Sequence, residues 1–399
     1  MRYSVTPLAS LPLNGLASTV PHSPTMAGAA VACAHSDPID LTVGEPSAAP
    51  PWEVREAAAK AALEDRARYG PAAGLPALRG LVAQDLSRRD GIPRHSEQVL
   101  ITPGGKAALL DGLRCLLDPG DEVLVCSPYW PSFPDQVRWA GGVPILVPHG
   151  EDLLPSVAAL DQALTPRTRA ILLNQPANPT GTLWDDARLA GLGALSRRRD
   201  FWILVDQVYG TLTFDGPEQP FLRHLPHLAA RTLLVESFSK RFAMTGYRLG
   251  AAVGPAALIQ AMTRLASSSV THACTLSQHA GIAALSLDGT WEREQLEELC
   301  AKRDLAFEGL HTLPGLRVQR PQGGLYLFPN ASRWMRHHGV ETDHDLVLRL
   351  RDEAGVKLLP GSAFGASGHF RISLGAPHGA LATAIRRLGR FFSKGGAHV

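Results

Sequence analysis

The chain has 399 residues, with 39 Lys and Arg against 37 Asp and Glu and a formal net charge of +2. This balance offers no basic surplus for nucleic acid or an anionic membrane, and no apolar run reaches the ~20 residues that a bilayer-spanning helix needs. The five cysteines are scattered and include no Cys-x-x-Cys pair. We therefore expect no disulfide framework, no metal site and a cytoplasmic protein with reduced thiols.

The length predicts more than one domain, because a single hydrophobic core rarely grows past ~250–300 residues. Residues 1–45 are rich in Ala, Pro and Ser and are interpreted as an N-terminal arm with part of a small domain. The arm carries one arginine and a broken apolar pattern, so we expect no signal peptide. Residues 46–290 are predicted as a large domain, and residues 291–399 as a small C-terminal domain.

In the large domain, short apolar runs alternate with longer amphipathic stretches. The predicted strands are Gln98–Thr102, Glu122–Cys126, Pro144–Val147, Ala170–Leu173, Trp202–Val205, Leu233–Glu236 and Leu249–Val253. Most are unbroken apolar runs, the pattern of strands buried on both faces of a mainly parallel sheet. The helices predicted between them include Leu75–Arg89, Lys106–Leu117, Ala187–Arg199 and Pro255–Ser268. The alternation predicts a doubly wound α/β domain with a mainly parallel seven-stranded sheet, in which ligands bind beyond the carboxyl ends of strands.

The C-terminal part predicts a smaller α+β module. Trp291–Leu313 is a long helix with charge on one face and is interpreted as the bridge between the domains. The module's predicted strands are Leu325–Phe328, Val356–Leu359 and Phe370–Ser373, and its predicted helices are Asp343–Ala354 and Ala380–Phe392.

Polar or aromatic residues follow the first predicted strands of the large domain. Gly104, Gly105 and Lys106 open a helix, where backbone N–H groups and the helix dipole favour a bound anion. By itself this pattern also fits a plain tight turn. Trp130 lies on a loop at the next strand end, where an indole is a candidate for stacking on a ligand ring and equally for core packing.

The next two strands also end in polar residues. Asn178 lies in Asn178-Pro179-Thr180-Gly181, which on its own predicts a turn. Asp206 ends the apolar run Phe201–Val205, and Tyr209 follows three residues later. A carboxylate at this position is costly to bury unless it meets a cation, such as a protonated ring nitrogen, or caps a helix.

The stretch after the strand Thr232–Val235 carries the most specific chemistry. Lys240 lies just past this strand, with Ser237 and Ser239 before it and Arg248 after it. A lysine that forms a Schiff base needs a rigid element and a polar or cationic shell that lowers its pKa and holds an anion. The serines and Arg248 suit a phosphate while Lys240 binds an aldehyde carbon, which suggests pyridoxal 5′-phosphate (PLP). The alternative is a solvated Lys-Arg pair after a strand.

Taken together, these motifs resemble those of the fold-type I aminotransferases of class I/II, in the family's order and spacing over residues 40–380. The resemblance implies the fold-type I PLP-transferase architecture, PLP as cofactor and aminotransferase activity. It implies three catalytic residues: Lys240 binds the aldehyde and moves the proton, Asp206 partners the ring nitrogen, and Tyr209 hydrogen-bonds the phenolic oxygen. The other matching cofactor-binding positions are Gly104, Gly105, Lys106, Trp130, Asn178, Ser237, Ser239 and Arg248.

Three further positions match the family outside these motifs. Tyr69 matches a tyrosine that reaches the phosphate of the neighbouring subunit, which implies an obligate homodimer with shared active sites. Arg371 in Phe370-Arg371-Ile372-Ser373 matches the arginine that binds the substrate α-carboxylate, a role that suits its bidentate fork. Gly44 matches the glycine beside that carboxylate, and Asn178 matches the asparagine that helps to place it.

The implied reaction moves an amino group from an L-amino acid to a 2-oxo acid with ping-pong kinetics. Lys106 is similar to the lysine of the aspartate/prephenate aminotransferase branch that can meet a distal carboxylate, which favours an acidic substrate. Gln207 departs from the family's glutamate, Gly324-Leu325-Tyr326 departs from Ala-Phe-Tyr, and the arm lacks that branch's arginine-rich segment.

Two other classes of PLP protein compete with this interpretation. A PLP-dependent lyase or cyclase, catalysing β- or γ-elimination on the same fold, stays open as the alternative. A PLP-sensing regulator would need a DNA-binding helix-turn-helix, for which the arm is too short and too weakly basic. The loop around His272 is interpreted as a surface segment rather than as part of an unusual pocket.

Overall fold

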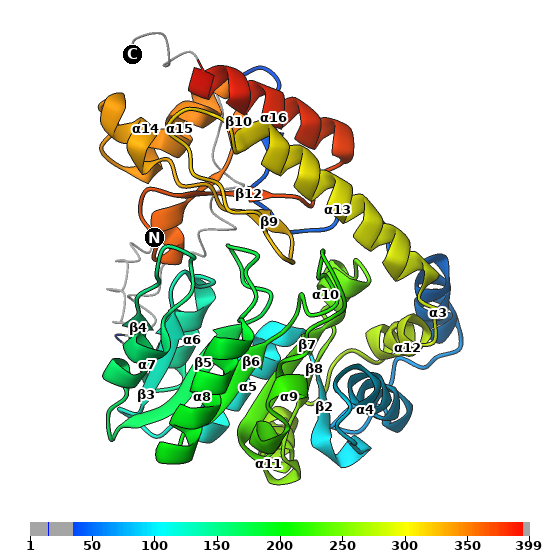
Figure 1. The fold of residues 1–399 in the computed structure, drawn as a ribbon. Helices are drawn as coiled ribbons and strands as arrows, with labels where there is room; N and C mark the ends of the chain where they lie inside the picture. The colour runs from blue at the N-terminus through cyan, green and yellow to red at the C-terminus, as the bar shows by residue number, and fades with distance from the viewer. Residues whose placement is uncertain (1–14, 16–34, 394–399) are drawn as a thin grey trace, which may run out of the picture.

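The computed structural model describes residue 15 and residues 35–393, so most of the predicted N-terminal arm lies outside the described residues. Figure 1 shows a large α/β unit below a smaller unit, and the long helix α13 (Thr290–Leu310) runs from one to the other. Among the described helices, none combines the length and apolar content that a membrane span requires. The cytoplasmic location stays a prediction.

Seven strands form the central sheet of the large unit. In spatial order they are β2 (Val99–Thr102), β8 (Gly250–Val253), β7 (Thr232–Ser237), β6 (Trp202–Asp206), β5 (Thr168–Asn174), β3 (Glu122–Cys126) and β4 (Val143–Val147). β8 pairs antiparallel with both of its neighbours, and the other neighbouring pairs are parallel. The predicted mainly parallel seven-stranded sheet is therefore confirmed.

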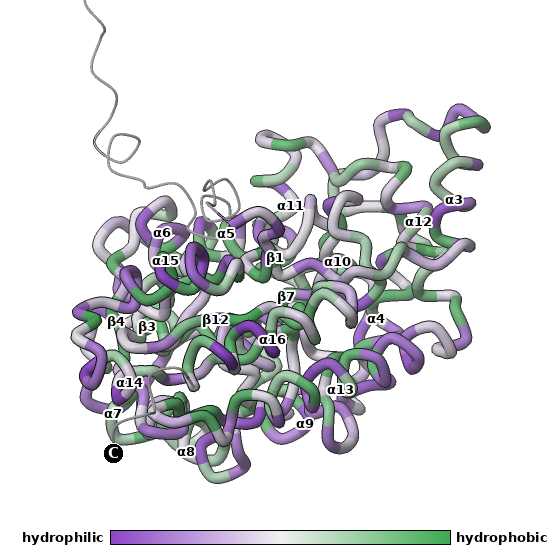
Figure 2. Tube along the Cα trace, turned by 90° about the horizontal axis from the view of Figure 1, so that it is seen from above, coloured by the Kyte–Doolittle hydropathy of each residue, from purple (hydrophilic) through white to green (hydrophobic). Residues whose placement is uncertain are grey.

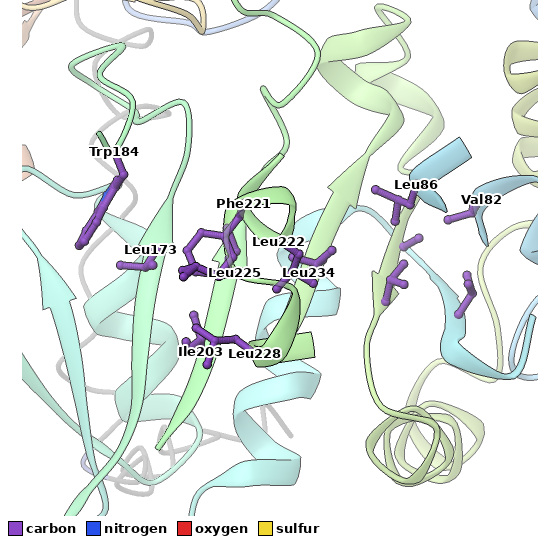
Figure 3. Close-up of a cluster of buried hydrophobic side chains, with 14 of the residues drawn as sticks. Val82, Leu86, Leu173, Trp184, Ile203, Phe221, Leu222, Leu225, Leu228 and Leu234 are labelled. Atoms are coloured by element: carbon purple, nitrogen blue, oxygen red, sulfur yellow. The ribbon is translucent and has the colours of Figure 1, made fainter. Parts of the chain in front are cut away.

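The strands divide their side chains between two hydrophobic clusters, one on each face of the sheet. Ile203 and Val205 of β6 lie in a cluster with Trp184 and Phe221 (Figure 3), whereas Leu204 lies in the cluster beneath α5 (Gly105–Leu116). Because both faces are covered, the strands appear in the sequence as unbroken apolar runs.

Helices cover both faces of this sheet. The first cluster includes residues of α4 (Pro76–Asp90), α7 (Val157–Ala163), α8 (Asp186–Arg198), α9 (Phe221–His224) and α12 (Thr275–Leu285). The second includes residues of α5, α6 (Ser132–Trp139) and α11 (Ala256–Ser269). Helix α3 (Trp52–Leu63) packs on α12 at the outer edge of the unit, as the two views in Figure 1 and Figure 2 show.

The smaller unit is built on a three-stranded antiparallel sheet of β11 (Leu359–Pro360), β12 (Phe370–Ser373) and β9 (Tyr326–Leu327). Helix α13 packs against α16 (His378–Ser393), and α14 (Ser332–His337) and α15 (Asp343–Ala354) complete the unit. β1 (Ile39–Asp40) pairs in parallel with β10 (Val356–Lys357), which attaches the segment before residue 46 to this unit. The domain boundaries at 45/46 and 290/291 stay a prediction.

One predicted strand of the small unit is wrong. The run Val356–Leu359 does not form a single strand, because the chain changes partner within it. β10 pairs with β1, and β11 pairs with β12 in a different sheet. Hydrophobic patterning does not reveal this break, because the change depends on two distant pairing partners.

Candidate active site

The candidate active site is a cavity of ≈ 240 Å³ between the two units, beyond the carboxyl ends of β5, β6 and β7. Its lining brings together most of the predicted site residues, namely Gly44, Gly105, Lys106, Trp130, Asn178, Asp206, Tyr209, Ser237, Ser239, Lys240, Arg248 and Arg371. Gly104 lies at the edge of the cavity beside Arg248. Tyr69 is the exception, since it is 91% exposed and outside this lining.

Lys240 is delivered by a short helix that begins at the end of β7. Ser237 ends this strand, and its hydroxyl accepts a hydrogen bond from the Ser239 N–H at the start of α10 (Phe238–Arg241). The Lys240 Nζ donates to the Gly44 carbonyl oxygen at 2.6 Å. Burial lowers the pKa of the Lys240 amine, and the Arg248 guanidinium lowers it further. A lower pKa leaves a larger fraction of neutral, nucleophilic amine.

Asp206 ends β6 and is buried. Burial raises the pKa of this carboxyl to about 7, and the Glu236 carboxylate adds to the rise, against the opposing effects of the Val208 N–H and Lys240. The Val208 N–H donates to Asp206 Oδ1 at 3.3 Å. A buried carboxylate of this kind is stabilised strongly by a nearby cation, which a protonated ring nitrogen supplies.

Arg371 on β12 is 1% exposed and is held from several sides. Its Nη1 donates to Asn178 Oδ1 at 3.0 Å, and its Nη2 donates to the Thr42 carbonyl oxygen. Its Nε is buried without a hydrogen-bond partner among the described residues. An orphaned guanidinium N–H in a cavity is costly, and a ligand carboxylate would satisfy it.

Glycine at position 104 allows a close approach at the start of α5. Gly104 has φ +86°, and a Cβ there would come within 2.6 Å of Arg248 Nη2. Arg248 is itself held by a hydrogen bond from Nη1 to the Thr245 carbonyl oxygen at 2.9 Å. A guanidinium beside the N-terminus of a helix forms a strong site for a phosphate, since backbone N–H groups and charge act together.

Lys106 and Trp130 form the other wall of the cavity. The Lys106 Nζ lies 4.6 Å from the centroid of the Trp130 ring. Burial lowers the pKa of Lys106, and the positive charge of Arg248 adds to this effect. An additional anion in the cavity would therefore stabilise the positive charge of Lys106.

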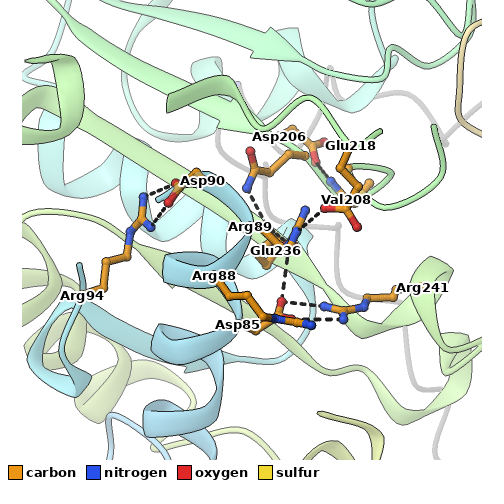
Figure 4. A network of polar contacts seen from close by, with 12 residues as sticks. Asp85, Arg88, Arg89, Asp90, Arg94, Asp206, Val208, Glu218, Glu236 and Arg241 are labelled. Atoms are coloured by element: carbon orange, nitrogen blue, oxygen red, sulfur yellow. Dashed lines mark hydrogen bonds and ion pairs between the residues drawn. The ribbon is translucent and has the colours of Figure 1, made fainter. Parts of the chain in front are cut away.

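A charge network, mostly shielded from solvent, is formed by Asp85, Arg89, Glu218, Glu236 and Arg241 (Figure 4). Arg89 pairs with Glu218 at 2.7 Å and with Glu236 at 3.2 Å, and Arg241 pairs with Asp85 at 2.6 Å. The network contacts residues that are adjacent in sequence to Lys240 and to Asp206. Arg241 follows Lys240, and Gln207, which follows Asp206, donates to Glu236 at 2.5 Å.

Several residues that shape the site were not predicted as site residues. Tyr326 lines the cavity, and its hydroxyl lies 3.0 Å from that of Tyr209. Glu236 belongs to the charge network, and the Thr42 carbonyl contacts Arg371. The sequence signals were present only in part: Tyr326 belongs to the Gly324-Leu325-Tyr326 stretch that departs from the family pattern, whereas Glu236 was predicted only as the end of a strand.

Tyr69 and His272 lie together at the surface. Their rings meet edge-on at 5.9 Å, and the Gly70 N–H donates to His272 Nε2 at 3.1 Å. His272 is only partly exposed and does not line the cavity. This histidine supports the loop that carries Tyr69 rather than an unusual pocket.

The residues present fit the expected cofactor. The buried Asp206 carboxylate suits a protonated ring nitrogen, and the Gly104–Arg248 contact forms a place for a phosphate. The partly buried Lys240 lines the same cavity, where an aldehyde carbon can reach its amine. The orphaned Arg371 Nε remains for a substrate carboxylate.

Comparisons with known proteins give one consistent result. The "Aminotransferase class I and II" family profile matches residues 36–388. An aspartate aminotransferase of Geobacillus stearothermophilus is 39% identical over 89% of this chain and 91% of its own length. An aspartate/prephenate aminotransferase of Thermus thermophilus is 36% identical over 90% of this chain and 92% of its own length.

Solved structures agree with these sequence comparisons. The structure of the aspartate aminotransferase from Thermus thermophilus with maleate is 34% identical, with a TM-score of 0.88 over 96% of this chain and 100% of that chain. The aspartate aminotransferase from Rhizobium meliloti is 31% identical, with a TM-score of 0.90 over 96% of this chain and 98% of that chain.

Proposed function

This chain belongs to the class I and II aminotransferases, and from that premise we propose that it uses PLP to transfer the amino group of an acidic L-amino acid to a 2-oxo acid. The observation that carries this proposal is the meeting of Lys240, Asp206 and Arg371 in one cavity. These residues come from separate elements of both units; Asp206 and Arg371 are buried, and Lys240 is partly buried.

When bound, PLP supplies an aldehyde for a lysine amine and an electron-withdrawing ring that stabilises negative charge at the amino acid Cα. Lys240 would hold the aldehyde carbon. With a substrate bound, the Lys240 amine would remove the Cα proton and later return a proton, and the Gly44 carbonyl that accepts from its Nζ would orient it.

The remaining residues bind and orient. Asp206 would keep the ring nitrogen protonated, while Tyr209 and Asn178 would hydrogen-bond the phenolic oxygen. Trp130 would cover a face of the ring. The phosphate would be held at the cavity edge by the side chains of Ser237, Ser239 and Arg248 and by the backbone N–H groups of Gly104, Gly105 and Lys106, which leaves the Lys106 ammonium group for another anion.

The proposed preference for acidic substrates rests on charge. The side chains of Lys106, Lys240, Arg248 and Arg371 face the cavity, and Asp206 is the acidic residue among the lining residues. After a phosphate at Arg248 and an α-carboxylate at Arg371, Lys106 is left to meet a second carboxylate. A relative's structure with maleate, a dicarboxylate, supports the same preference.

We also propose a homodimer with shared active sites. Tyr69 is 91% exposed and lies outside the cavity of its own protomer, as expected for a residue that reaches the phosphate in a partner. Exposed apolar side chains lie on neighbouring segments: Trp52 and Leu63 belong to α3, which packs on α12, and Val270 precedes His272, which contacts Tyr69. Apolar surface of this kind favours burial in an interface.

The function is tested by a half-reaction screen on the purified protein loaded with PLP. Aspartate or glutamate alone should abolish the visible absorbance of the lysine-linked cofactor, and a 2-oxo acid should restore it. Alanine and lysine should act much more weakly. Normal turnover by a Lys240→Ala variant would contradict the proposal. Release of ammonia without any 2-oxo acid would instead support the lyase or cyclase alternative.

A further inference from the structure

Tyr326 lies in the active-site cavity without a role in the function proposed above. It begins β9 in the smaller unit, is 3% exposed and lines the cavity. It is therefore placed to act on groups of the large unit from the opposite side. Its contacts with two of the proposed functional residues are direct.

The first contact is between two hydroxyl groups. Tyr326 Oη lies 3.0 Å from Tyr209 Oη, and the two rings meet edge-on with centroids 5.8 Å apart. A phenol has one proton to donate. If Tyr209 donates its proton to the phenolic oxygen of PLP, then Tyr326 has to donate to Tyr209. Such a chain polarises Tyr209 and makes it a stronger donor.

The second contact is between the ring and a guanidinium group. Arg371 Cζ lies 4.2 Å from the centroid of the Tyr326 ring and 4.9 Å from that of Phe364. Gly44 packs tightly against the same tyrosine, since a Cβ at Gly44 would fall 1.8 Å from Tyr326 Oη. The tyrosine is therefore confined between the segment that carries Gly44 and the arginine.

We propose that Tyr326 is a positioning residue with two separable parts: its hydroxyl donates to Tyr209, and its ring fixes the guanidinium of Arg371 for a substrate carboxylate. The role rests on the proposed function, because it requires PLP beside Tyr209 and a carboxylate at Arg371. The two parts predict different defects in two variants.

Tyr326→Phe keeps the ring and removes the hydroxyl. The pH titration of the lysine-linked cofactor absorbance should shift its midpoint upward by about 0.2–0.7 pH unit, because a weaker Tyr209 donor stabilises the phenolic oxygen less. The neighbouring nitrogen then holds its proton more tightly. The KM for aspartate should stay within about twofold of the unsubstituted enzyme, since the ring still covers Arg371.

Tyr326→Leu removes both parts. It should show the same upward shift of the titration midpoint, together with a rise in the KM for aspartate of about tenfold from the lost cation–π contact. Tyr129→Phe is the matched control, since it removes a half-buried phenol that lies outside this cavity. Its midpoint and KM should not change.

The outcomes distinguish a failure of the role of Tyr326 from a failure of the proposed function. An unchanged midpoint in folded Tyr326→Phe, with thermal melting like that of the unsubstituted protein, overturns the role of the hydroxyl. An unchanged KM in Tyr326→Leu overturns the role of the ring. If the unsubstituted protein forms no lysine-linked chromophore with PLP, the proposed function and this role both fail.

Discussion

At the scale of single residues, the ionised carboxylate of Asp206 destabilises the folded protein until a cationic ligand binds beside it. Five apolar residues lead up to it, and the fold buries it at the end of β6. Its pKa is about 7 rather than the ordinary 3.8, chiefly because burial penalises the carboxylate. The energy required to ionise this group would be recovered when a protonated ring nitrogen binds beside it.

This cost gives a pH-dependent prediction for the cofactor-free protein. Because the folded pKa lies above the unfolded one, the contribution of Asp206 to stability is fully present below about pH 4 and lost as the pH rises through about 7. Asn at position 206 cannot ionise, so Asp206→Asn removes this pH-dependent loss of stability. In urea denaturation without PLP, the variant should be more stable than the unsubstituted protein by about 2–4 kcal/mol at about pH 8, with much less difference at about pH 5.

The same variant should bind PLP more weakly and lose most activity. Added PLP should therefore raise the melting temperature of the unsubstituted protein more than that of Asp206→Asn. Equal pH dependence of stability in the two cofactor-free proteins would show that Asp206 is not the group that titrates.

Arg371 gives a prediction about substrate binding. Arg371→Lys keeps a positive charge but loses the planar fork and the hydrogen bonds to Asn178 and Thr42. The KM for aspartate should rise about 10- to 100-fold, as expected for the loss of a bidentate charged contact. Steady-state kinetics measure this rise. Arg317→Lys, in an exposed ion pair with Glu151, is the matched control and should leave KM unchanged.

At the scale of secondary-structure elements, site residues could be predicted where a polar or charged side chain lies at the end of a buried strand or shortly after it. Asp206 is the last residue of the buried strand β6, and Asn178 and Lys240 lie a few residues beyond β5 and β7. An apolar run followed by a polar residue is visible in the sequence, and parallel strands bring such ends to one edge. The break between β10 and β11 could not be predicted in the same way, because it depends on which distant strand each half pairs with.

Gly104 at the start of α5 allows a test of one element. Gly104→Ala introduces strain at φ +86° and a clash with Arg248. Gly91→Ala, at the end of α4, introduces the same backbone strain at φ +80° with nothing within 4 Å. Both variants should lose about 1 kcal/mol of stability. Only Gly104→Ala should weaken PLP binding, by about tenfold or more in a fluorescence titration, because it displaces Arg248 from the proposed phosphate site.

At the scale of the whole molecule, the site depends on contacts that no local pattern contains. Tyr326 and Arg371 reach the cavity from the smaller unit, and the segment with Thr42 and Gly44 lies between the units and contacts both. Such contacts join residues hundreds of positions apart, so the sequence identified them only where a family motif marked them. Arg371 was marked in this way. Tyr326, whose neighbours differ from the family pattern, was not assigned a role.

The proposed shared site predicts complementation between two defective subunits. Lys240→Ala subunits should be inactive, and Tyr69→Ala subunits should be inactive at limiting PLP because the partner's phosphate loses a ligand. In a hybrid dimer, one site carries both substitutions and the other carries neither. If equal amounts of the two variants are mixed and their subunits pair at random, about half of the dimers are hybrids, and each hybrid has one intact site of two. Mixing should therefore restore about one quarter of the unsubstituted specific activity.

A hybrid dimer gives different activities for a shared and for an unshared active site. If Tyr69 served the cavity of its own chain, each hybrid site would carry one substitution, and mixing would restore nothing. Activity equal to the mean of the separate variants would thus contradict the shared site, even if gel filtration showed a dimer. The exposed position of Tyr69, away from the cavity of its own protomer, leads us to expect restoration, since only a second copy of the chain can then bring this tyrosine to a phosphate at Arg248.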